Sequence, residues 1–242
     1  MTILAIETAT EVCGAALVRK GAVIGEASIN APHIHSEKLI GLVDESLGRA
    51  AVDLGNIDGI AVSIGPGSFT GLRIGLSVAK GLAFASGKPV VPVPTLKALA
   101  SHAGRESLAG SPSLVLAMID AGRGDLYLAA YRDTRGTLQE VAQPRVAAPE
   151  EVVALFGDER RIVIMGDGAD KFQPWLTAAH PALSLRFLFP PRASRLCSAA
   201  AVGLIGEEEL AAGRAADLAT LEPVYGKDFR TLVREHHPEV HS

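Results

Sequence analysis

The order of the secondary-structure elements predicted from the residue pattern occurs twice along the chain, and this repetition constrains the fold more than any other feature. In each half, three strand-like runs precede a helical stretch, a buried strand and another helical stretch. The predicted strands of the first half lie at 2–8, 12–19, 22–29, 58–64 and 90–93, and its helices at 35–49, 69–86 and 95–103. The second half has predicted strands at 114–120, 125–132, 137–146 and 162–165, a helix that opens at Pro149, a helical stretch after Gly168 and a long helix near 193–213. Both halves open with a strand that ends in an acid, Glu7 or Asp120.

A duplicated β-β-β-α-β-α unit predicts an α/β protein with two lobes. This layout resembles the actin-like superfold of actin, hexokinase and Hsp70, also called the ASKHA or ribonuclease H-like fold. We therefore expect a first lobe at 1–108 and a second lobe at 109–192, joined through a linker at 104–113. The helix near 193–213 and the tail are expected to join the first lobe.

Composition and charge narrow the class of protein. Of the 242 residues, 48% are apolar, which predicts a globular chain. The net charge of −4 disfavours a stand-alone nucleic-acid binder, because such proteins usually carry a clear basic excess. The first apolar run is broken by Glu7 and no run of about eighteen apolar residues occurs, so we expect no signal peptide, no membrane span and a cytoplasmic location. Cys13 and Cys197 are expected to be buried, reduced thiols.

The turns that follow the two acid-ended strands are weak candidates for a nucleotide site. In an active member of the superfold, such a turn presents backbone N–H groups to a phosphate, and the acid helps to hold magnesium. The candidate residues here are Glu7, Thr8, Thr10 and Asp120. The first turn has no glycine before Gly14, so a hydrogen-bonded hairpin is the alternative, and Arg123 and Asp125 add bulk and charge to the second. We therefore expect no ATP hydrolysis by the chain alone.

The segment GPGSFTGLRIG at 65–75 is the most distinctive motif. It is not a Walker A loop, because no Gly-Lys-Ser/Thr closes it, and it is not a dinucleotide fingerprint, because Thr70 stands where the third glycine is required. A sharp strand-to-helix turn with a capped helix is predicted, formed by Gly65, Gly67, Ser68, Thr70 and Gly71. The alternative is an anion site at the helix N-terminus, with Arg73 one turn into the helix.

The helix predicted at 69–86 is apolar on nearly every side, so it must be buried on nearly every side. One side can pack on its own sheet, and the other is covered either by the second lobe or by a partner protein. We favour a partner surface shared with the helix at 35–49. The predicted interface residues are His35, Leu39, Leu42, Val43, Leu47, Phe69, Leu72, Arg73, Leu76, Ala79, Lys80 and Ala83. On this hypothesis, Leu76→Glu or Ala79→Arg abolishes association and leaves the fold intact.

The histidines do not form a metal-binding pattern. His33 and His35 are two residues apart near a helix start, and His102 is followed four residues later by Glu106, so neither pair suits a zinc site. The remaining candidates in the tail are His236, His237 and His241. No Ser-His-Asp arrangement can be assigned without a nucleophile elbow. We therefore expect neither a metal site nor catalytic residues.

The chain resembles the bacterial TsaB (YeaZ) family of tRNA threonylcarbamoyladenosine biosynthesis proteins, which is part of the TsaD and glycopeptidase-like group. The resemblance rests on LAIETAT at 4–10, HSEKL at 35–39 and, above all, GPGSFTGLRIG at 65–75. Weaker matches are the segment from Asp120 to Tyr127, GDG at 166–168 and PVY at 223–225.

This resemblance implies a non-catalytic dimerisation or scaffold subunit. It implies a heterodimer with a TsaD-like paralogue that carries the metal and ATP or ADP, and no cofactor in the isolated chain. With a TsaE-like ATPase, the complex would transfer threonylcarbamoyl to the tRNA adenosine next to the anticodon. A homodimer through the same surface is expected when the chain is alone. The His-x-x-x-His metal pair of TsaD enzymes is reduced here to His102 and Glu106.

Three positions depart from the family pattern. Glu7 stands where Asp is common, Gly122 interrupts an Asp-Ala-Arg run, and Tyr225-Gly226-Lys227 replaces Tyr-Leu-Arg. They concern the phosphate turns and the C-terminal contacts, and not the first-lobe helices. Two alternative functions stay open at this point: a small-molecule kinase or ATPase of the actin-like superfold, and a glycopeptidase-like metallopeptidase.

Overall fold

The computed structural model describes residues 1–105, 113–134 and 137–226. The chain forms two units and passes between them three times. The first unit contains Met1–His102 and Leu196–Pro223, and the second contains Ala103–Arg195 and the residues from Val224 on. The lobes were predicted at 1–108 and 109–192, with the residues after 192 joining the first lobe. The structure differs in that Ala103 and residues 193–195 belong to the second unit.

Five strands form the sheet of the first unit, in the order β3-β2-β1-β4-β5. They are β1 (Thr2–Glu7), β2 (Val12–Arg19), β3 (Ala22–Asn30), β4 (Gly59–Gly65) and β5 (Val90–Pro94). β1, β2 and β3 pair antiparallel through short turns, whereas β4 and β5 join in parallel after helical crossovers. Every strand predicted in this half is confirmed to within one residue at each end.

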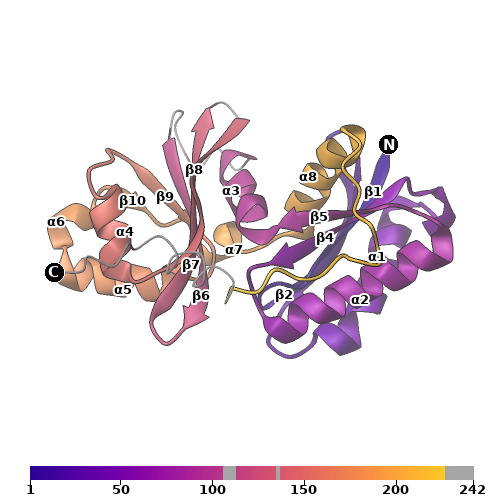
Figure 1. The fold of residues 1–242 in the computed structure, drawn as a ribbon, viewed down its shortest axis with the longest axis horizontal. Coiled ribbons are helices and arrows are strands. Elements are labelled where there is room, and N and C mark those ends of the chain that lie inside the picture. Colours follow the sequence, from indigo (N-terminus) through magenta and orange to yellow (C-terminus); the bar gives the residue numbers. More distant parts are fainter. Residues whose placement is uncertain (106–112, 135–136, 227–242) are drawn as a thin grey trace, which may run out of the picture. The chain divides into compact units, whose positions relative to one another are not determined.

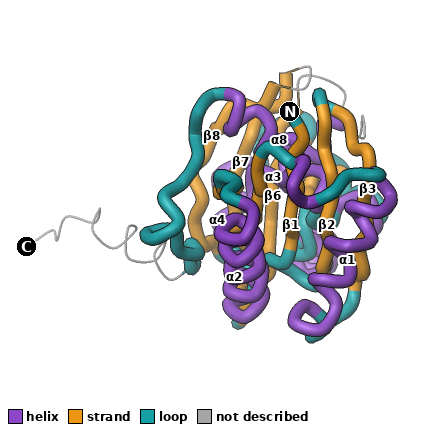
Figure 2. The backbone as a smooth tube through the Cα atoms, turned by 90° about the vertical axis from the view of Figure 1, so that its right-hand side faces the viewer, coloured by secondary structure: helices purple, strands orange, loops and turns teal. Residues whose placement is uncertain are grey.

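Alternate residues of β1 face opposite sides of this sheet. Leu4 and Ile6 belong to a core with α1 (His35–Ala50) and α2 (Phe69–Ser86), and Ile3 and Ala5 belong to a core with α8 (Ala199–Ala211). Figure 1 shows α1 and α2 next to each other on one side of the sheet and α8 on the other. In Figure 2, α1 runs along β2 and β3. The first unit also contains the 3-10 helix η1 (Leu54–Asn56) and most of α3 (Thr95–Arg105), which crosses into the second unit at Ala103.

The second unit repeats this topology, with the sheet order β10-β9-β6-β7-β8. Its strands are β6 (Ser113–Gly122), β7 (Asp125–Thr134), β8 (Thr137–Ala147), β9 (Ile162–Met165) and β10 (Phe187–Leu188), and its helices are α4 (Pro149–Phe156), α5 (Ala169–Ala179), α6 (Pro181–Ser184) and α7 (Arg192–Arg195). As in the first unit, the first three strands pair antiparallel and the last two add in parallel beside the first. Leu116 and Met118 of β6 pack with Phe172 and Leu176 of α5. The predicted α/β fold with a duplicated β-β-β-α-β-α unit is confirmed.

The single long helix predicted at 193–213 is wrong. The chain forms the short helix α7, and α8 then starts after Ser198, whose backbone is extended and whose hydroxyl accepts a hydrogen bond from the Ala201 N–H at 3.4 Å. Ser198 is an N-cap signal inside an alanine-rich run, and it starts a new helix instead of continuing the old one. Glu207 then ties α8 to the β2–β3 turn, because its carboxylate accepts the Lys20 and Gly21 N–H groups at 2.7 and 2.6 Å.

The end of the described chain groups with the second unit. Gly226 lies so close to Tyr127 of β7 that a Cβ at position 226 would overlap the tyrosine ring. The expectation that the tail joins the first lobe is therefore corrected for residues 224–226. They group with the second unit, where the missing side chain of Gly226 allows its backbone to contact the Tyr127 ring.

Cys13 and Cys197 are buried free thiols, as predicted. Burial and the nearby Glu7 carboxyl raise the pKa of the Cys13 thiol to about 11. Among the described helices, none combines the length and the apolar character needed to cross a membrane.

Candidate functional site

The turn after β1, where the actin-like fold would bind a phosphate, is buried in this chain. Glu7 and Thr8 are fully buried, Ala9 is 1% exposed and Thr10 is 9% exposed. Several of its polar groups form hydrogen bonds within the chain itself. The Ala9 N–H donates to Glu7 Oε1 at 2.6 Å, and the Ala9 carbonyl accepts the Ser68 N–H at 2.7 Å.

Residues outside the turn complete its enclosure. The Thr8 N–H donates to the Ser63 hydroxyl of β4 at 3.4 Å, and His35 Nε2 lies 2.9 Å from the Thr10 carbonyl, to which it can donate. His35, predicted to face a partner, is thus buried at the start of α1 and bridges that helix to the turn.

Helix α2 fills the space above this turn. A Cβ at Gly71 would overlap the Thr8 carbonyl, and a Cβ at Gly75 would overlap the Thr8 hydroxyl. Gly67, just before the helix, lies equally close to the Ala9 carbonyl. The glycines of the 65–75 motif therefore allow the helix to contact the turn directly, where a phosphate would otherwise lie.

The electrostatic state of Glu7 also differs from that of a magnesium ligand. Burial raises its pKa to about 7, although the hydrogen bond from the Ala9 N–H opposes this shift. Glu7 Oε2 and the Thr8 hydroxyl are buried and have no hydrogen-bond partner in the part of the chain described. A carboxyl that still carries its proton about half of the time at pH 7 is a poorer ligand for a hard cation than an ionised one.

In the second unit, the corresponding turn is occupied by an internal ion pair. Lys171 Nζ of α5 lies 2.8 and 2.7 Å from the two carboxylate oxygens of Asp120. Asp120 Oδ1 also accepts the Gly122 N–H at 2.8 Å, and the Asp120 N–H donates to Asp167 of the GDG segment at 3.2 Å. A lysine ammonium therefore stands where a bound cation would meet this carboxylate.

At the 65–75 motif, Ser68 is the N-cap of α2. Its hydroxyl accepts the Gly71 N–H at 3.2 Å, while Thr70 is exposed within the first turn. Gly65 has a φ of +117° and donates its N–H to the Thr95 hydroxyl at 3.1 Å. The Arg73 guanidinium lies 3.8 Å from the centroid of the Phe69 ring.

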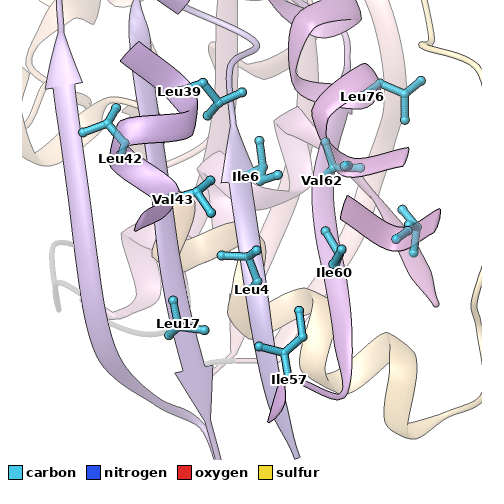
Figure 3. Close-up of a cluster of buried hydrophobic side chains, with 14 of the residues drawn as sticks. Leu4, Ile6, Leu17, Leu39, Leu42, Val43, Ile57, Ile60, Val62 and Leu76 are labelled. Atoms are coloured by element: carbon cyan, nitrogen blue, oxygen red, sulfur yellow. The ribbon is translucent and has the colours of Figure 1, made fainter. Parts of the chain in front are cut away.

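Most of the predicted interface residues lie in the chain's own core. Figure 3 shows Leu39, Leu42, Val43 and Leu76 among the side chains of the first sheet. The buried set is His35, Leu39, Leu42, Val43, Leu72, Leu76, Ala79 and Ala83, and Leu47 and Lys80 are half-buried. The expectation that these eight side chains face a partner is corrected, because the β-sheet below α1 and α2 already covers them.

The outer face of α2 carries different residues. Phe69, Arg73, Ser77, Gly81 and Phe84 are exposed, and their spacing of three or four residues places them on one side of the helix. We call these five residues the α2 outer face. Phe84, which the sequence analysis did not single out as an interface residue, is 89% exposed. Its position three, seven and eleven residues after Gly81, Ser77 and Arg73, which places it on the same side of the helix, is the sequence signal that could have identified it.

No group of three or more His, Cys, Asp or Glu side chains able to hold a metal occurs in the described residues. His33 is exposed and His102 is half-buried, and the two belong to different elements of the first unit. Glu106, His236, His237 and His241 lie outside the described residues.

Comparison with known proteins extends this description. The family model for TsaD, tRNA N6-adenosine threonylcarbamoyltransferase, matches residues 27–219. The chain is 39% identical over 153 residues to the tRNA threonylcarbamoyladenosine biosynthesis protein TsaB of Escherichia coli. This match covers 63% of the chain and 64% of the relative, so it spans less than two thirds of the relative's length.

Solved structures cover more of the chain. YeaZ from Pseudomonas aeruginosa is 30% identical, with a TM-score of 0.77 over 93% of this chain and 99% of that one. A ROK family glucokinase from Streptomyces griseus, solved with glucose and AMPPNP, has a TM-score of 0.51 at 8% identity, covering 86% of this chain and 100% of that one. The second likeness concerns the fold alone. With the duplicated topology and the match over most of its length, the chain belongs to the TsaB (YeaZ) family and has the two-lobed, actin-like fold.

Proposed function

We propose that this chain is a non-catalytic subunit in the biosynthesis of threonylcarbamoyladenosine in tRNA, and that it acts as a scaffold for a TsaD-like paralogue. The observation that carries the proposal is the enclosed turn at Glu7 and Thr8, on which Gly71 and Gly75 of α2 pack directly. The relative from E. coli is named for this biosynthesis, which supports the assignment of the pathway.

The α2 outer face is the proposed docking surface. An aromatic ring as exposed as Phe84 exposes apolar area to water, and burial against a partner would remove that area. Ser77 and Gly81 are small, so a helix of the partner can approach α2 closely between Arg73 and Phe84. In the isolated chain, the same face would pair two copies around a two-fold axis.

In this proposal the partner supplies the chemistry. ATP or ADP and the metal reside on the TsaD-like subunit, a TsaE-like ATPase joins through the complex, and tRNA is the substrate of the assembly in the cytoplasm. The Asp120–Lys171 ion pair and the buried, partly protonated Glu7 both support the absence of a nucleotide site in this chain.

The test is co-expression with the TsaD-like protein of the same organism, followed by gel filtration and reconstitution of tRNA modification. Phe84→Asp and Gly81→Arg should abolish the complex and the modification, because both place charge or bulk in the contact without entering the core. Leu185→Asp is the matched control, since Leu185 is also 89% exposed but belongs to the second unit.

Full complex formation by both α2 variants would contradict the docking surface. Micromolar ATP binding by the isolated chain, lost in Glu7→Ala, would favour a kinase instead. Leu76→Glu and Ala79→Arg are not useful here, because both side chains are buried and the substitutions would disturb the fold itself.

A further inference from the structure

Strand pairing gathers arginines at one end of the second sheet. Ile162 of β9 pairs with Phe187 of β10 and with Leu114 of β6, and Leu114 pairs in turn with Arg132 of β7. Arg161 and Arg186 directly precede Ile162 and Phe187, and the Ile162 N–H donates to the Arg186 carbonyl at 2.9 Å. Since neighbouring strands are about 4.8 Å apart, these arginines occupy the same edge of the unit.

Two of the arginines anchor the loop that connects α4 to β9. Arg186 donates to the Gly157 carbonyl at 3.0 Å, and Arg132 donates to Glu159 at 2.7 Å. The ion pair neutralises Glu159, and both contacts hold the loop at 157–161 against the ends of the strands. The backbone that carries Arg160 and Arg161 is thus fixed from two sides.

Arg160 and Arg161 themselves are exposed and form no hydrogen bond or ion pair with the described part of the chain. Around them, the half-buried or exposed charges are four arginines against the carboxylates of Asp158, Glu159 and Glu140, the last on β8 opposite Tyr131. Asp133 at the same strand end is buried. Two consecutive arginines with unused donors are suited to phosphate oxygens, which a guanidinium group can bind through paired N–H bonds.

We propose that Arg160 and Arg161 bind the phosphate backbone of tRNA when this chain is part of the modification complex. The inference rests on the proposed function, from which RNA is chosen as the polyanion. Because the net charge of the whole chain is −4, two phosphate contacts alone give little affinity for RNA. In this proposal, Arg160 and Arg161 therefore add to phosphate contacts made by the partner subunit.

The experiment measures binding of a labelled, unmodified tRNA transcript to the complex of the full chain with its TsaD-like partner. Fluorescence anisotropy is recorded between about 50 and 200 mM salt. Arg160→Gln combined with Arg161→Gln should weaken binding several-fold at low salt. It should also lower the slope of log Kobs against log salt by about 1 to 2, as expected for the loss of one or two phosphate contacts. Arg160→Lys with Arg161→Lys should keep most of the slope, because the charge is retained.

Lys20→Asn with Arg214→Gln is the matched control, since it removes the same charge from exposed positions of the first unit. An unchanged affinity and slope in the Gln variant, in a complex that still forms on gel filtration, would overturn this inference and leave the proposed function standing. An equal loss in the control would overturn it too, because the effect would then be one of net charge. If the wild-type chain forms no complex, the proposed function fails and this inference fails with it.

Vesicles of phosphatidylserine and phosphatidylcholine test a lipid surface as the polyanion. Binding of the wild-type complex to them, weakened by the Gln substitutions while tRNA binding is unaffected, would replace RNA by a membrane surface. We expect the Gln substitutions to weaken tRNA binding and to leave any vesicle binding unchanged.

Discussion

At the residue scale, Glu7 has a chemical state that its position in the sequence did not predict. It ends the first strand, as the magnesium-holding acid of the actin-like fold does, but the protein encloses it completely. A carboxyl without water or a nearby cation favours its neutral form, and this is the cause of its raised pKa. Glu7 is therefore a buried carboxyl at the end of β1 that is only partly ionised near pH 7.

The raised pKa of Glu7 predicts how stability depends on pH. The folded chain keeps a proton up to a pKa of about 7, whereas the unfolded chain releases it near 4.5, so the free energy of unfolding falls as pH rises through this window. The loss at pH 8 amounts to about 3 kcal/mol. Glu7→Gln, which is always neutral, should equal the wild type near pH 4, below both pKa values, and exceed its stability at pH 8. Urea unfolding across this range tests the prediction, with exposed Glu222→Gln as the control. A wild-type stability that stays level or rises from pH 5 to 8 would contradict it.

A pair of glycines in α2 tests the contact between the helix and the Thr8 turn. Gly75→Ala should lower the free energy of unfolding by about 1–3 kcal/mol, because the new methyl group overlaps the buried Thr8 hydroxyl. Gly81→Ala meets no atom within 4 Å and should raise it by about 0.5–1 kcal/mol through helix propensity. Thermal or urea unfolding of the isolated chain measures both. Equal effects at the two positions would argue against the close approach.

At the scale of elements, α2 has two faces with different roles. Its inner face, with Leu76, Ala79 and Ala83, is part of the first core, and its N-terminus is capped by Ser68. Its outer face is left for a partner in our proposal. Packing on its own sheet therefore explains the high apolar content of this helix better than contact with a partner does.

The segment at 224–226 is a second element-scale feature, because Gly226 packs against Tyr127 without room for a side chain. Gly226→Ala should release this segment and speed amide hydrogen exchange at 224–226, with little change in the β-strands of either sheet. In a Tyr127→Ala background, the same change should have a much smaller effect, because the overlapping ring is gone. Gly55→Ala, which meets no neighbouring atom, is the control. An equal effect in both backgrounds would show that the ring is not the cause.

At the scale of the whole molecule, the chain consists of two units with one topology, and we propose that neither binds a nucleotide. Both units retain the same sheet order, and each retains the acid at the end of its first strand. In one unit this acid is buried under a helix, and in the other it is paired with Lys171. If the α2 outer face also joins two copies of the isolated chain, Phe84→Asp should convert a homodimer to a monomer in sedimentation experiments.

The motifs at 4–10, 35–39 and 65–75 carried the resemblance to the family. The sequence by itself also determined the order of the strands and α-helices in the first half, most of their limits and the repeated β-β-β-α-β-α unit. These follow from local signals, namely hydrophobic periodicity, glycine turns and the Ser68 cap, which act within a few residues. The break at Ser198 was missed because the alanine-rich residues around it suit a helix on either side.

Only the tertiary structure decided which side of each apolar helix is covered. Periodicity placed Leu76 and Phe84 in one apolar helix, but the position of the sheet buries Leu76 and leaves Phe84 exposed. Likewise, the raised pKa of Glu7 depends on its burial by the folded chain. The gathering of Arg132, Arg161 and Arg186 at one edge of the second sheet depends on strand pairing between residues far apart in the chain. Burial and charge environment are set by such long-range contacts, and for this reason they could not be read from the local pattern.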